Sequence, residues 1–202
     1  MALRILGGAF KGLKLDVNEK TTRPTGVMLK RRLFDARQRF DGVHFIDLCA
    51  GSGSIGFEAL SRGANKLSLI ESDFNALRCI KDVVNKIENN KNFESSKSHI
   101  SVSKKSAERW LSFHLDNDAK KELDLEQIIF FDPPYEDSRL YRKVLDLLLE
   151  KGFVGELWVE YDITSQKDLI TRIDEIFQLN GVKKYRHGQH EVAMMRFNEN
   201  MI

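Results

Sequence analysis

Two hydrophobic patterns alternate along most of this chain. Short runs of consecutive apolar residues are followed by longer stretches in which apolar residues recur with the spacing of a helix. The short runs predict buried strands, and the longer stretches predict helices with one apolar face. Strands are predicted at residues 43–48, 66–71, 100–103, 127–131, 155–161, 178–187 and 190–197. Helices are predicted at residues 27–40, 54–61, 74–87, 107–113, 138–150 and 166–176.

The alternation of strand and helix from residue 43 onward is typical of an α/β fold. It predicts parallel strands joined by crossover helices that cover both faces of one sheet. Gly188 and Gln189 separate the last two strands by a tight turn, so these two strands should form an antiparallel hairpin at the sheet edge. We therefore expect a Rossmann-like, mostly parallel, seven-stranded sheet with a C-terminal antiparallel hairpin.

The first part of the chain departs from this alternation. Residues 4–6 and 13–15 are short strand candidates separated by glycines, and they predict a small hairpin ahead of the first helix. We expect residues 1–42 to form a small β/α extension and residues 43–202 to form the main domain. The two parts should pack as a single compact unit.

Basic residues concentrate in the same N-terminal stretch. Residues 1–40 contain ten Lys and Arg against three Asp and Glu, a net charge of +7, whereas the whole chain carries only +2. The remaining residues therefore carry −5. A basic arm on a mildly acidic body is typical of proteins that contact a polyanion. A solvated basic face without a partner is the alternative.

The overall composition indicates one soluble globular domain, with 202 residues of which 42% are hydrophobic and 31% charged. No apolar run approaches the roughly 20 residues of a membrane span, and the N-terminus lacks the apolar segment of a signal peptide. Cys49 and Cys79 form no disulfide framework or metal motif. His187 and His190 flank a turn without a cysteine or acid cluster beyond Glu191. We expect a cytoplasmic monomer with no metal and no membrane partner.

The most informative stretch runs from Phe130 to Tyr135 and reads FFDPPY. A buried strand must end at Pro133 and Pro134, because neither proline can donate an N–H to a neighbouring strand. Asp132 is therefore expected at the carboxyl end of a strand, where open α/β sheets place their chemistry. Its carboxylate and a proline carbonyl can each accept one N–H from a planar amine, and the ring of Tyr135 can stack on that group. An ordinary Asp-Pro turn with a packed tyrosine is the simpler alternative.

A glycine-rich loop follows the first strand of the main domain. Residues 51–56 read GSGSIG, which matches the G-x-G-x-x-G of dinucleotide-binding loops, and Glu71 lies twenty positions after Gly51. The glycines allow the backbone to approach a ligand closely, and Glu71 can accept hydrogen bonds from two ribose hydroxyls. NAD and S-adenosylmethionine share an adenosine half, so the loop alone is compatible with both.

Asp47 helps to separate the two cofactors. A carboxylate at the end of the strand attracts the ammonium and sulfonium of S-adenosylmethionine and repels a pyrophosphate. The turn at Asp132 favours the same cofactor, because hydride transfer does not require a site that binds an amine. A carboxylate that only satisfies the N-terminus of the next helix is the alternative for Asp47.

Taken in order, these residues resemble the RsmD-type methyltransferases, bacterial enzymes that methylate guanine N2 in small-subunit (16S) ribosomal RNA. The resemblance covers nearly the whole chain and is closest from Asp47 through Gly63. It includes RILGG at residues 4–8, RPT at residues 23–25, Glu71 and the Asp132–Tyr135 turn. It implies a class I S-adenosylmethionine-dependent methyltransferase fold. It also implies ribosomal RNA as partner, within a partly or fully assembled small subunit.

The resemblance further implies roles for individual residues. The catalytic turn would consist of Asp132, Pro133, Pro134 and Tyr135. The cofactor would be held by Asp47, Cys49, Ala50, Gly51, Ser52 and Gly53 around its methionine part, by Glu71 on the ribose, and by Ser72, Ser106 and Ala107 near the adenine. The charge of the N-terminal arm, and not the resemblance, is the basis for expecting RNA to be bound by Lys11, Arg23, Lys30, Arg31 and Arg32.

The chain departs from its relatives at two places. Relatives often carry Asp or Asn where this chain has Ser106, which is a shorter partner for the adenine amine. After residues 23–25, relatives carry an acid, a basic residue and later a Glu where this chain has Val27, Met28 and Arg31. Contacts made by that segment with cofactor or RNA are therefore expected to differ, and the target nucleotide does not follow from the sequence.

Three other functions are compatible with parts of the sequence. A DNA adenine or cytosine amino-methyltransferase would use the same turn, although no target-recognition domain is evident. An NAD-dependent oxidoreductase would use the same glycine loop, but Asp47 and the proline turn disfavour it. A non-catalytic RNA-binding relative is disfavoured by the intact turn, although the changes at Val27 and Met28 leave this alternative open.

Overall fold

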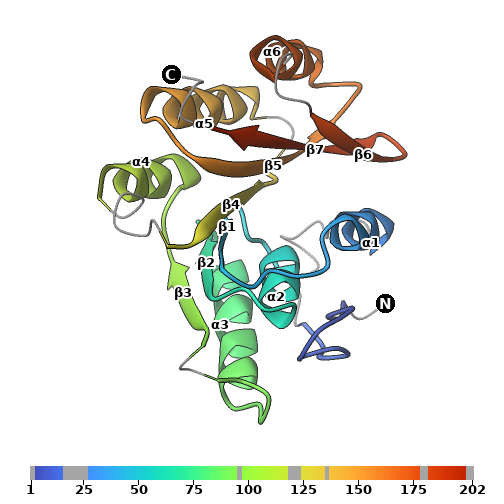
Figure 1. Ribbon diagram of the computed structural model, residues 1–202, viewed down its shortest axis with the longest axis vertical. Coiled ribbons are helices and arrows are strands. Elements are labelled where there is room, and N and C mark those ends of the chain that lie inside the picture. Colours follow the sequence, from blue (N-terminus) through green and yellow to red (C-terminus); the bar gives the residue numbers. More distant parts are fainter. Residues whose placement is uncertain are drawn as a thin grey trace.

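A single sheet of seven strands forms the centre of the molecule (Figure 1). The computed structural model describes residues 3–15, 27–94, 97–117, 124–134, 137–177 and 182–198. The strands are β1 (Val43–Asp47), β2 (Lys66–Ile70), β3 (His99–Ser103), β4 (Glu126–Phe131), β5 (Gly155–Asp162), β6 (Lys183–His187) and β7 (His190–Phe197). They lie in the order β3-β2-β1-β4-β5-β7-β6. Neighbours from β3 to β5 are parallel, and β7 is antiparallel to β5 and β6, which confirms the predicted fold class.

Helices cover both faces of this sheet. They are α1 (Val27–Ala36), α2 (Ser54–Ser61), α3 (Phe74–Glu88), α4 (Ala107–Asn117), α5 (Ser138–Glu150) and α6 (Lys167–Phe177). In Figure 1, α1, α2 and α3 lie on one side of the sheet, and α4, α5 and α6 lie on the other. The predicted bounds of α2 and α5 are confirmed, and α4 is one turn longer than predicted. Among the described residues, no helix has both the length and the apolar character needed to cross a membrane.

Alternate residues of the central strands face two separate cores. Phe45, Phe130 and Trp158 pack with the N-terminal segment and α1 to α3. Phe131 and Val159, each next in sequence to one of these residues, pack beneath α4 to α6. The alternation follows from the pleat of a strand, and it allows a sheet to bury apolar side chains on both faces.

The first helix ends earlier than its apolar spacing predicts. The prediction extended it to Phe40, but α1 ends at Ala36. The backbone N–H of Phe40 donates instead to the carbonyl of Arg62, at 3.1 Å. The ring of Phe40 is fully buried against Phe45, with ring centroids 5.8 Å apart. Tertiary packing, and not helical periodicity, therefore places Phe40 in the core.

The N-terminal segment, residues 3–15, folds back on itself and docks on α2. Arg4 and Lys14 form an isolated antiparallel bridge, so the expected hairpin is present with a single pair of bridged residues. The buried carboxylate of Glu58 accepts hydrogen bonds from the backbone N–H groups of Leu6 and Gly7, at 2.7 and 2.8 Å. The side chain of Ser61, also on α2, accepts a hydrogen bond from the N–H of Phe10 and donates to the carbonyl of Gly7, so two side chains of α2 fix the course of this segment.

Glu58 also holds two cations. The ammonium of Lys30, from α1, lies 3.1 Å from one carboxylate oxygen, and Nε of Arg62 lies 2.9 Å from the other. Lys30 is 1% exposed and Glu58 is not exposed at all. Burial lowers the pKa of Lys30, while the negative charge of Glu58 opposes that change. We name these three residues, with the N–H groups of Leu6 and Gly7, the Glu58 clamp, because it joins the N-terminal segment, α1 and α2.

Candidate active site

The glycine loop and the proline turn leave the sheet side by side. β1 and β4 are parallel neighbours, with Asp47 opposite Phe130, and the N–H of Leu48 donates to the carbonyl of Phe130 at 3.0 Å. β2 continues from β1 in one direction and β4 lies in the other, so this is the point where the strand order reverses. Ligands of open α/β sheets bind outside the carboxyl ends of the strands at such a point.

The conformation of the loop requires glycine at two positions. Gly51 and Gly53 have φ angles of 54° and 70°, in the left-handed region that other residues rarely adopt. A Cβ atom on Gly53 would lie 2.5 Å from the ring of Phe57. A Cβ atom on Gly56 would lie 2.7 Å from Leu69 of β2, because α2 packs closely on that strand. The glycine pattern therefore shapes the loop and seats α2 against the sheet.

Asp47 has a buried carboxylate with one oxygen that is not satisfied. The side chain is 2% exposed, and Oδ2 accepts a hydrogen bond from the N–H of Gly56 at 3.3 Å. Oδ1 is buried and finds no hydrogen-bond partner in the described part of the chain. Burial raises the pKa of Asp47 to about 7, with a further contribution from the negative charge of Glu71. A buried polar atom is normally hydrogen-bonded, so Oδ1 fits an external donor such as an ammonium group.

Glu71 braces the loop as well as facing the ligand side. Its two carboxylate oxygens accept hydrogen bonds from the N–H groups of Gly51 and Asp73, at 2.8 and 2.7 Å. Each oxygen retains a lone pair that can accept from a ribose hydroxyl. Ser72 follows at the end of β2, and Ser106 and Ala107 follow the end of the neighbouring strand β3. Ser72 and Ser106 are exposed, and Ala107 is buried.

Several carboxylates converge on Cys49. Burial raises the pKa of its thiol well above the ordinary value, and the negative charges of Asp47, Asp132, Glu71 and Asp137 raise it further, in that order of effect. These acids come from the ends of β1, β4 and β2 and from the cap of α5. A site lined in this way favours a cationic ligand over a pyrophosphate.

The side chain of Tyr141 on α5 contacts the proline turn from the protein interior. Its hydroxyl donates to the carbonyl of Glu160 at 2.9 Å and approaches the carbonyl of Pro133 at 3.4 Å. Tyr141 is buried, and its ring meets Phe131 edge-on with centroids 5.4 Å apart. Sequence reasoning did not single out Tyr141, because its helical spacing marks it only as a core residue of α5.

The members of the turn differ in exposure. Asp132 is half-buried, Pro133 is buried and Pro134 is exposed, while Tyr135 lies outside the described residues. Asp137 then caps α5, since its side chain accepts a hydrogen bond from the N–H of Leu140 at 3.0 Å. The structure therefore brings Asp132 and Pro133 beside the glycine loop. The stacking role of Tyr135 stays a prediction.

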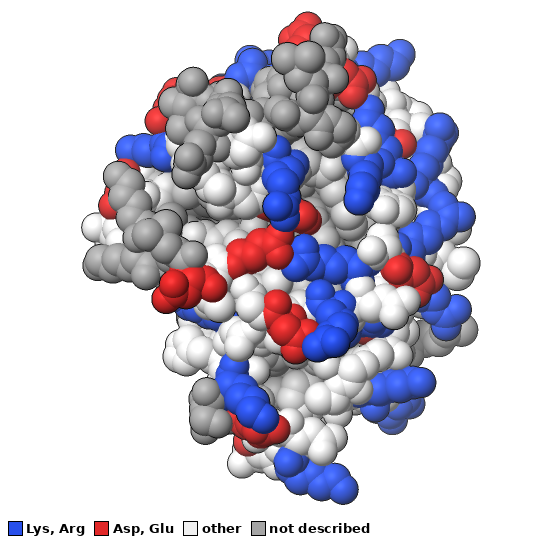
Figure 2. Space-filling view, in the orientation of Figure 1, with Lys and Arg blue, Asp and Glu red and all other residues white. Residues whose placement is uncertain are grey.

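The predicted RNA-binding residues differ in their surroundings. Lys11, Arg31 and Arg32 are exposed, and Arg32 also donates to the carbonyl of Arg186. Figure 2 shows basic side chains along the side of the molecule where α1 and β6 lie in Figure 1. Arg23 lies outside the described residues. The prediction that Lys30 binds RNA is wrong, because its ammonium is buried against Glu58 and cannot reach a phosphate on the surface.

Comparison of the chain with known proteins shows which family it belongs to. The model of the family described as Conserved hypothetical protein 95 matches residues 3–196. The chain belongs to this family. A Bacillus subtilis relative, YlbH, provisionally named an rRNA methyltransferase, is 34% identical over 193 residues, which cover 91% of this chain and 98% of the relative. The Ribosomal RNA small subunit methyltransferase D of Haemophilus influenzae is 33% identical over 174 residues, covering 84% and 82% of the two chains. The resemblance to RsmD-type methyltransferases is thereby confirmed.

Solved structures show the same fold. A methylase from Haemophilus influenzae superposes with a TM-score of 0.70 and 25% identity, covering 98% of this chain and 99% of the other. An RNA methyltransferase from Salinibacter ruber, solved in complex with S-adenosyl-L-homocysteine, has a TM-score of 0.57 at 12% identity and covers 88% and 95% of the two chains. Membership of the family and this fold place the chain among the Rossmann-like methyltransferases.

Proposed function

We propose that this protein transfers a methyl group from S-adenosylmethionine to the exocyclic N2 amine of a guanine in small-subunit ribosomal RNA. The observation that carries the proposal is the position of the Asp132-Pro133 turn beside Asp47 and the glycine loop that follows Asp47. One element suits an aromatic amine, and the other suits a cationic cofactor. The relatives named as small-subunit rRNA methyltransferases indicate the class of substrate.

The residues of the loop fit S-adenosylmethionine. The unsatisfied Oδ1 of Asp47 would accept from its ammonium, and the glycines allow the backbone of residues 50–53 to approach its methionine part. Glu71 would accept from the ribose, with Ser72, Ser106 and Ala107 near the adenine and Cys49 beside the methionine part. When bound, the cofactor supplies an electrophilic methyl group on a sulfonium.

The chain's own contribution to the chemistry is to orient the amine. The lone pair of an aromatic amine is delocalised into the ring, so the nitrogen is a poor nucleophile. Hydrogen bonds from the NH2 group to the Asp132 carboxylate and the Pro133 carbonyl would favour a pyramidal nitrogen and fix the direction of its lone pair. The Asp132 carboxylate would also stabilise the positive charge that develops on that nitrogen. A proton leaves the nitrogen after transfer, so Asp132 need not act as a base beforehand.

The N-terminal extension would contact the RNA. Lys11, Arg31 and Arg32 are exposed and would lie against phosphates, and Arg23 would add to them. The Glu58 clamp holds part of this extension firmly against α2, so the basic side chains would be presented to the RNA from a fixed position. A guanine in a duplex cannot reach the turn, so the target base would be unpaired or extruded.

The test is label transfer from methyl-labelled S-adenosylmethionine, followed by identification of the labelled nucleoside. The acceptors are unmethylated small ribosomal subunits, protein-free 16S rRNA and DNA. Label recovered as N2-methylguanosine from the subunits or from the rRNA supports the proposal. Label in DNA would indicate the amino-methyltransferase of DNA instead, and label in another nucleoside would exclude guanine N2 as the target.

A further inference from the structure

α4 and α5 run parallel with a fixed register. Lys143 pairs with Glu108 at 2.9 Å, and Lys151 pairs with Asp116 at 2.7 Å. Both pairs join residues that are 35 positions apart. The same offset places Arg139, one turn before Lys143, level with the residues that lead into α4. The N-terminal ends of the two helices therefore lie side by side, at the edge of the sheet that also carries the proline turn.

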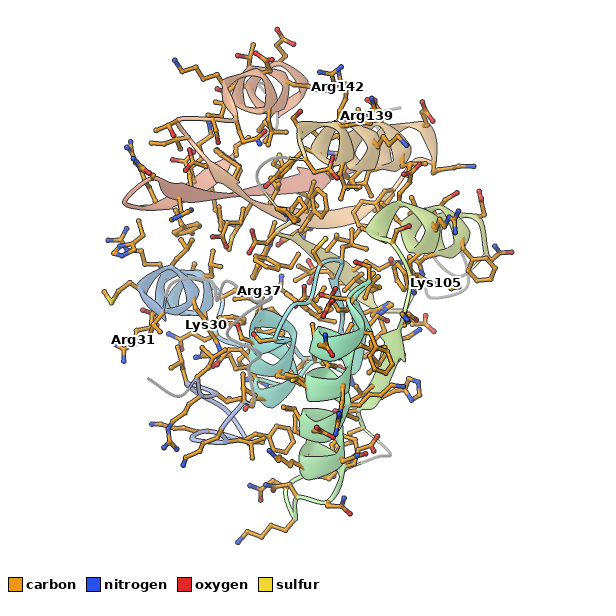
Figure 3. All side chains as sticks on the ribbon, turned by 180° about the vertical axis from the view of Figure 1, so that it is seen from behind. Lys30, Arg31, Arg37, Lys105, Arg139 and Arg142 are labelled. Atoms are coloured by element: carbon orange, nitrogen blue, oxygen red, sulfur yellow. The ribbon has the colours of Figure 1, made fainter. Side chains whose placement is uncertain are left out.

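The N-terminal ends of α4 and α5 carry several exposed basic residues. Lys104 and Lys105 precede α4, and Arg139 and Arg142 lie in the first two turns of α5. All four are exposed, and none forms an ion pair with a described acid, unlike Lys143 and Lys151 further along α5. Figure 3 shows Lys105, Arg139 and Arg142 over α4 and α5, apart from Arg31 on α1. They form a second basic surface, on the face of the sheet opposite to α1.

A positive charge at this end of α5 opposes the helix dipole. The N-terminus of a helix carries a partial positive charge, so a cation in the first turn is unfavourable and an anion is favourable. The carboxylate of Asp137 caps this end of α5 and offsets part of that charge, since it accepts a hydrogen bond from the N–H of Leu140. The attraction for an anionic ligand at this place therefore comes from the arginines and not from the helix end.

Exposed aromatic rings accompany the lysines. Phe74, the first residue of α3, is 62% exposed, and Phe113 of α4 is 54% exposed. The ammonium of Lys104 lies 5.1 Å from the ring centre of Phe74, and that of Lys105 lies 5.1 Å from the ring centre of Phe113. Flat rings interleaved with cations are typical of surfaces that bind single-stranded nucleic acid.

We propose that Phe74, Lys104, Lys105, Phe113, Arg139 and Arg142, named here the α4–α5 rim, bind a single-stranded stretch of RNA that flanks the target base. The cations contact phosphates and the two rings stack with bases. This inference rests on the proposed function for the identity of the nucleic acid. It adds a contact surface on the far side of the proline turn from the N-terminal extension.

The test compares two double variants of α5 that remove the same charge. Arg139→Gln with Arg142→Gln removes rim arginines, and Lys143→Gln with Lys151→Gln removes lysines that are already paired within the protein. Affinity for unmethylated protein-free 16S rRNA is measured between about 50 and 200 mM salt. The rim variant should flatten the slope of log affinity against log salt by about 0.7 to 1 per lost phosphate contact. The control variant should leave the slope unchanged.

Loss of the two phenylalanine rings should change the rRNA affinity but not its salt dependence. Phe74→Ala with Phe113→Ala should weaken binding about fivefold or more while the salt slope stays the same, because stacking releases no counterions. Circular dichroism and S-adenosylmethionine affinity, both unchanged, would show that the variants are folded.

The inference would be overturned if the rim arginine variant bound rRNA with the slope of the wild type. It would also be overturned if affinity fell only for assembled subunits, which would indicate an acidic ribosomal protein as the partner. These outcomes concern the rim alone whenever the wild type labels guanine N2 in rRNA. Failure of that labelling by the wild type, with rRNA still bound through the rim, would overturn the proposed function and leave the rim supported.

Discussion

At the scale of single residues, Asp47 is the most informative group in the site. Its carboxylate is buried, one oxygen is unsatisfied among the described residues, and its pKa is raised to about 7. The protein keeps this arrangement although a buried carboxylate destabilises the free protein when it is ionised. A cationic ligand would supply the missing hydrogen bond and charge, so the instability of the free protein and the affinity for ligand have the same origin.

The pH dependence of stability follows from this raised pKa. The folded protein binds the Asp47 proton more tightly than the unfolded chain does. Protonation of Asp47 therefore increases the free energy of unfolding, and this contribution is fully present below about pH 4. It is lost as pH rises through about 7, and it amounts to at most about 4 kcal/mol. Asp47→Asn should remove this loss in denaturant titrations between pH 5 and 8. Asp162→Asn is the control, because the pKa of Asp162 is lowered to about 2 and lies outside the range.

Cofactor affinity should change in the opposite direction with pH. A bound ammonium favours ionised Asp47. As pH rises toward about 7, the Kd for S-adenosylmethionine should therefore fall by up to about tenfold per pH unit, and above about pH 7 it should stay constant. Calorimetric titration would measure this. A Kd independent of pH from 5.5 to 8, or one unaffected by Asp47→Asn, would contradict the role of Asp47 in holding the cofactor.

At the scale of elements, the Glu58 clamp decides how the N-terminal segment is presented. Glu58→Ala leaves Lys30 buried without its counterion and leaves the N–H groups of Leu6 and Gly7 unpaired. We expect it to lower the free energy of unfolding by about 3–5 kcal/mol, because the remaining charge is buried. Hydrogen exchange at Leu6 and Gly7 should also become faster.

An exposed pair provides the control for the clamp. Glu94→Ala removes the partner of Lys97, and both side chains are more than half exposed, so the cost should not exceed about 1 kcal/mol. Glu58→Gln combined with Lys30→Met should recover stability relative to Glu58→Ala, since the buried ammonium is removed together with its counterion. Equal costs for Glu58→Ala and Glu94→Ala would show that the clamp does not hold the segment.

Elements with a complete local signal were predictable from the sequence. α2 and α5 have the predicted bounds, because their periodicity is bounded by clear signals such as Gly63 and the proline turn. Asp47, the glycine loop and the turn at Asp132 were also predictable, since strand ends of a parallel sheet meet at one edge.

Features that depend on tertiary contacts were not predictable. The spacing of Phe40 continues the apolar face of α1, yet the helix ends at Ala36. The N–H of Phe40 donates to the carbonyl of Arg62, which lies in another segment. Lys30 has the composition of a surface base, and only its buried partner Glu58 reveals that it belongs to the core. The role of Tyr141 depends on two carbonyls from other segments. No pattern within a single segment carries this information.

At the scale of the whole molecule, basic residues border the reaction edge from both faces of the sheet. Lys11, Arg31 and Arg32 lie with the N-terminal segment and α1, whereas the basic residues of the α4–α5 rim lie at α4 and α5 on the other face. The carboxylates that surround Cys49 lie between them. Under the proposed function, RNA bound from both faces of the sheet would place the target base near an acidic centre that suits a cationic cofactor.

The most direct test of the account is the single-turnover rate of methyl transfer to unmethylated small ribosomal subunits for Asp132→Asn. Asp137→Asn is the matched control, because it removes the same charge nearby and asparagine still caps α5. We predict a rate about 10²–10³-fold lower for Asp132→Asn, with unchanged Kd for S-adenosylmethionine, and a near-normal rate for Asp137→Asn. A near-normal rate for Asp132→Asn would contradict the central claim that this turn orients and stabilises the reacting amine.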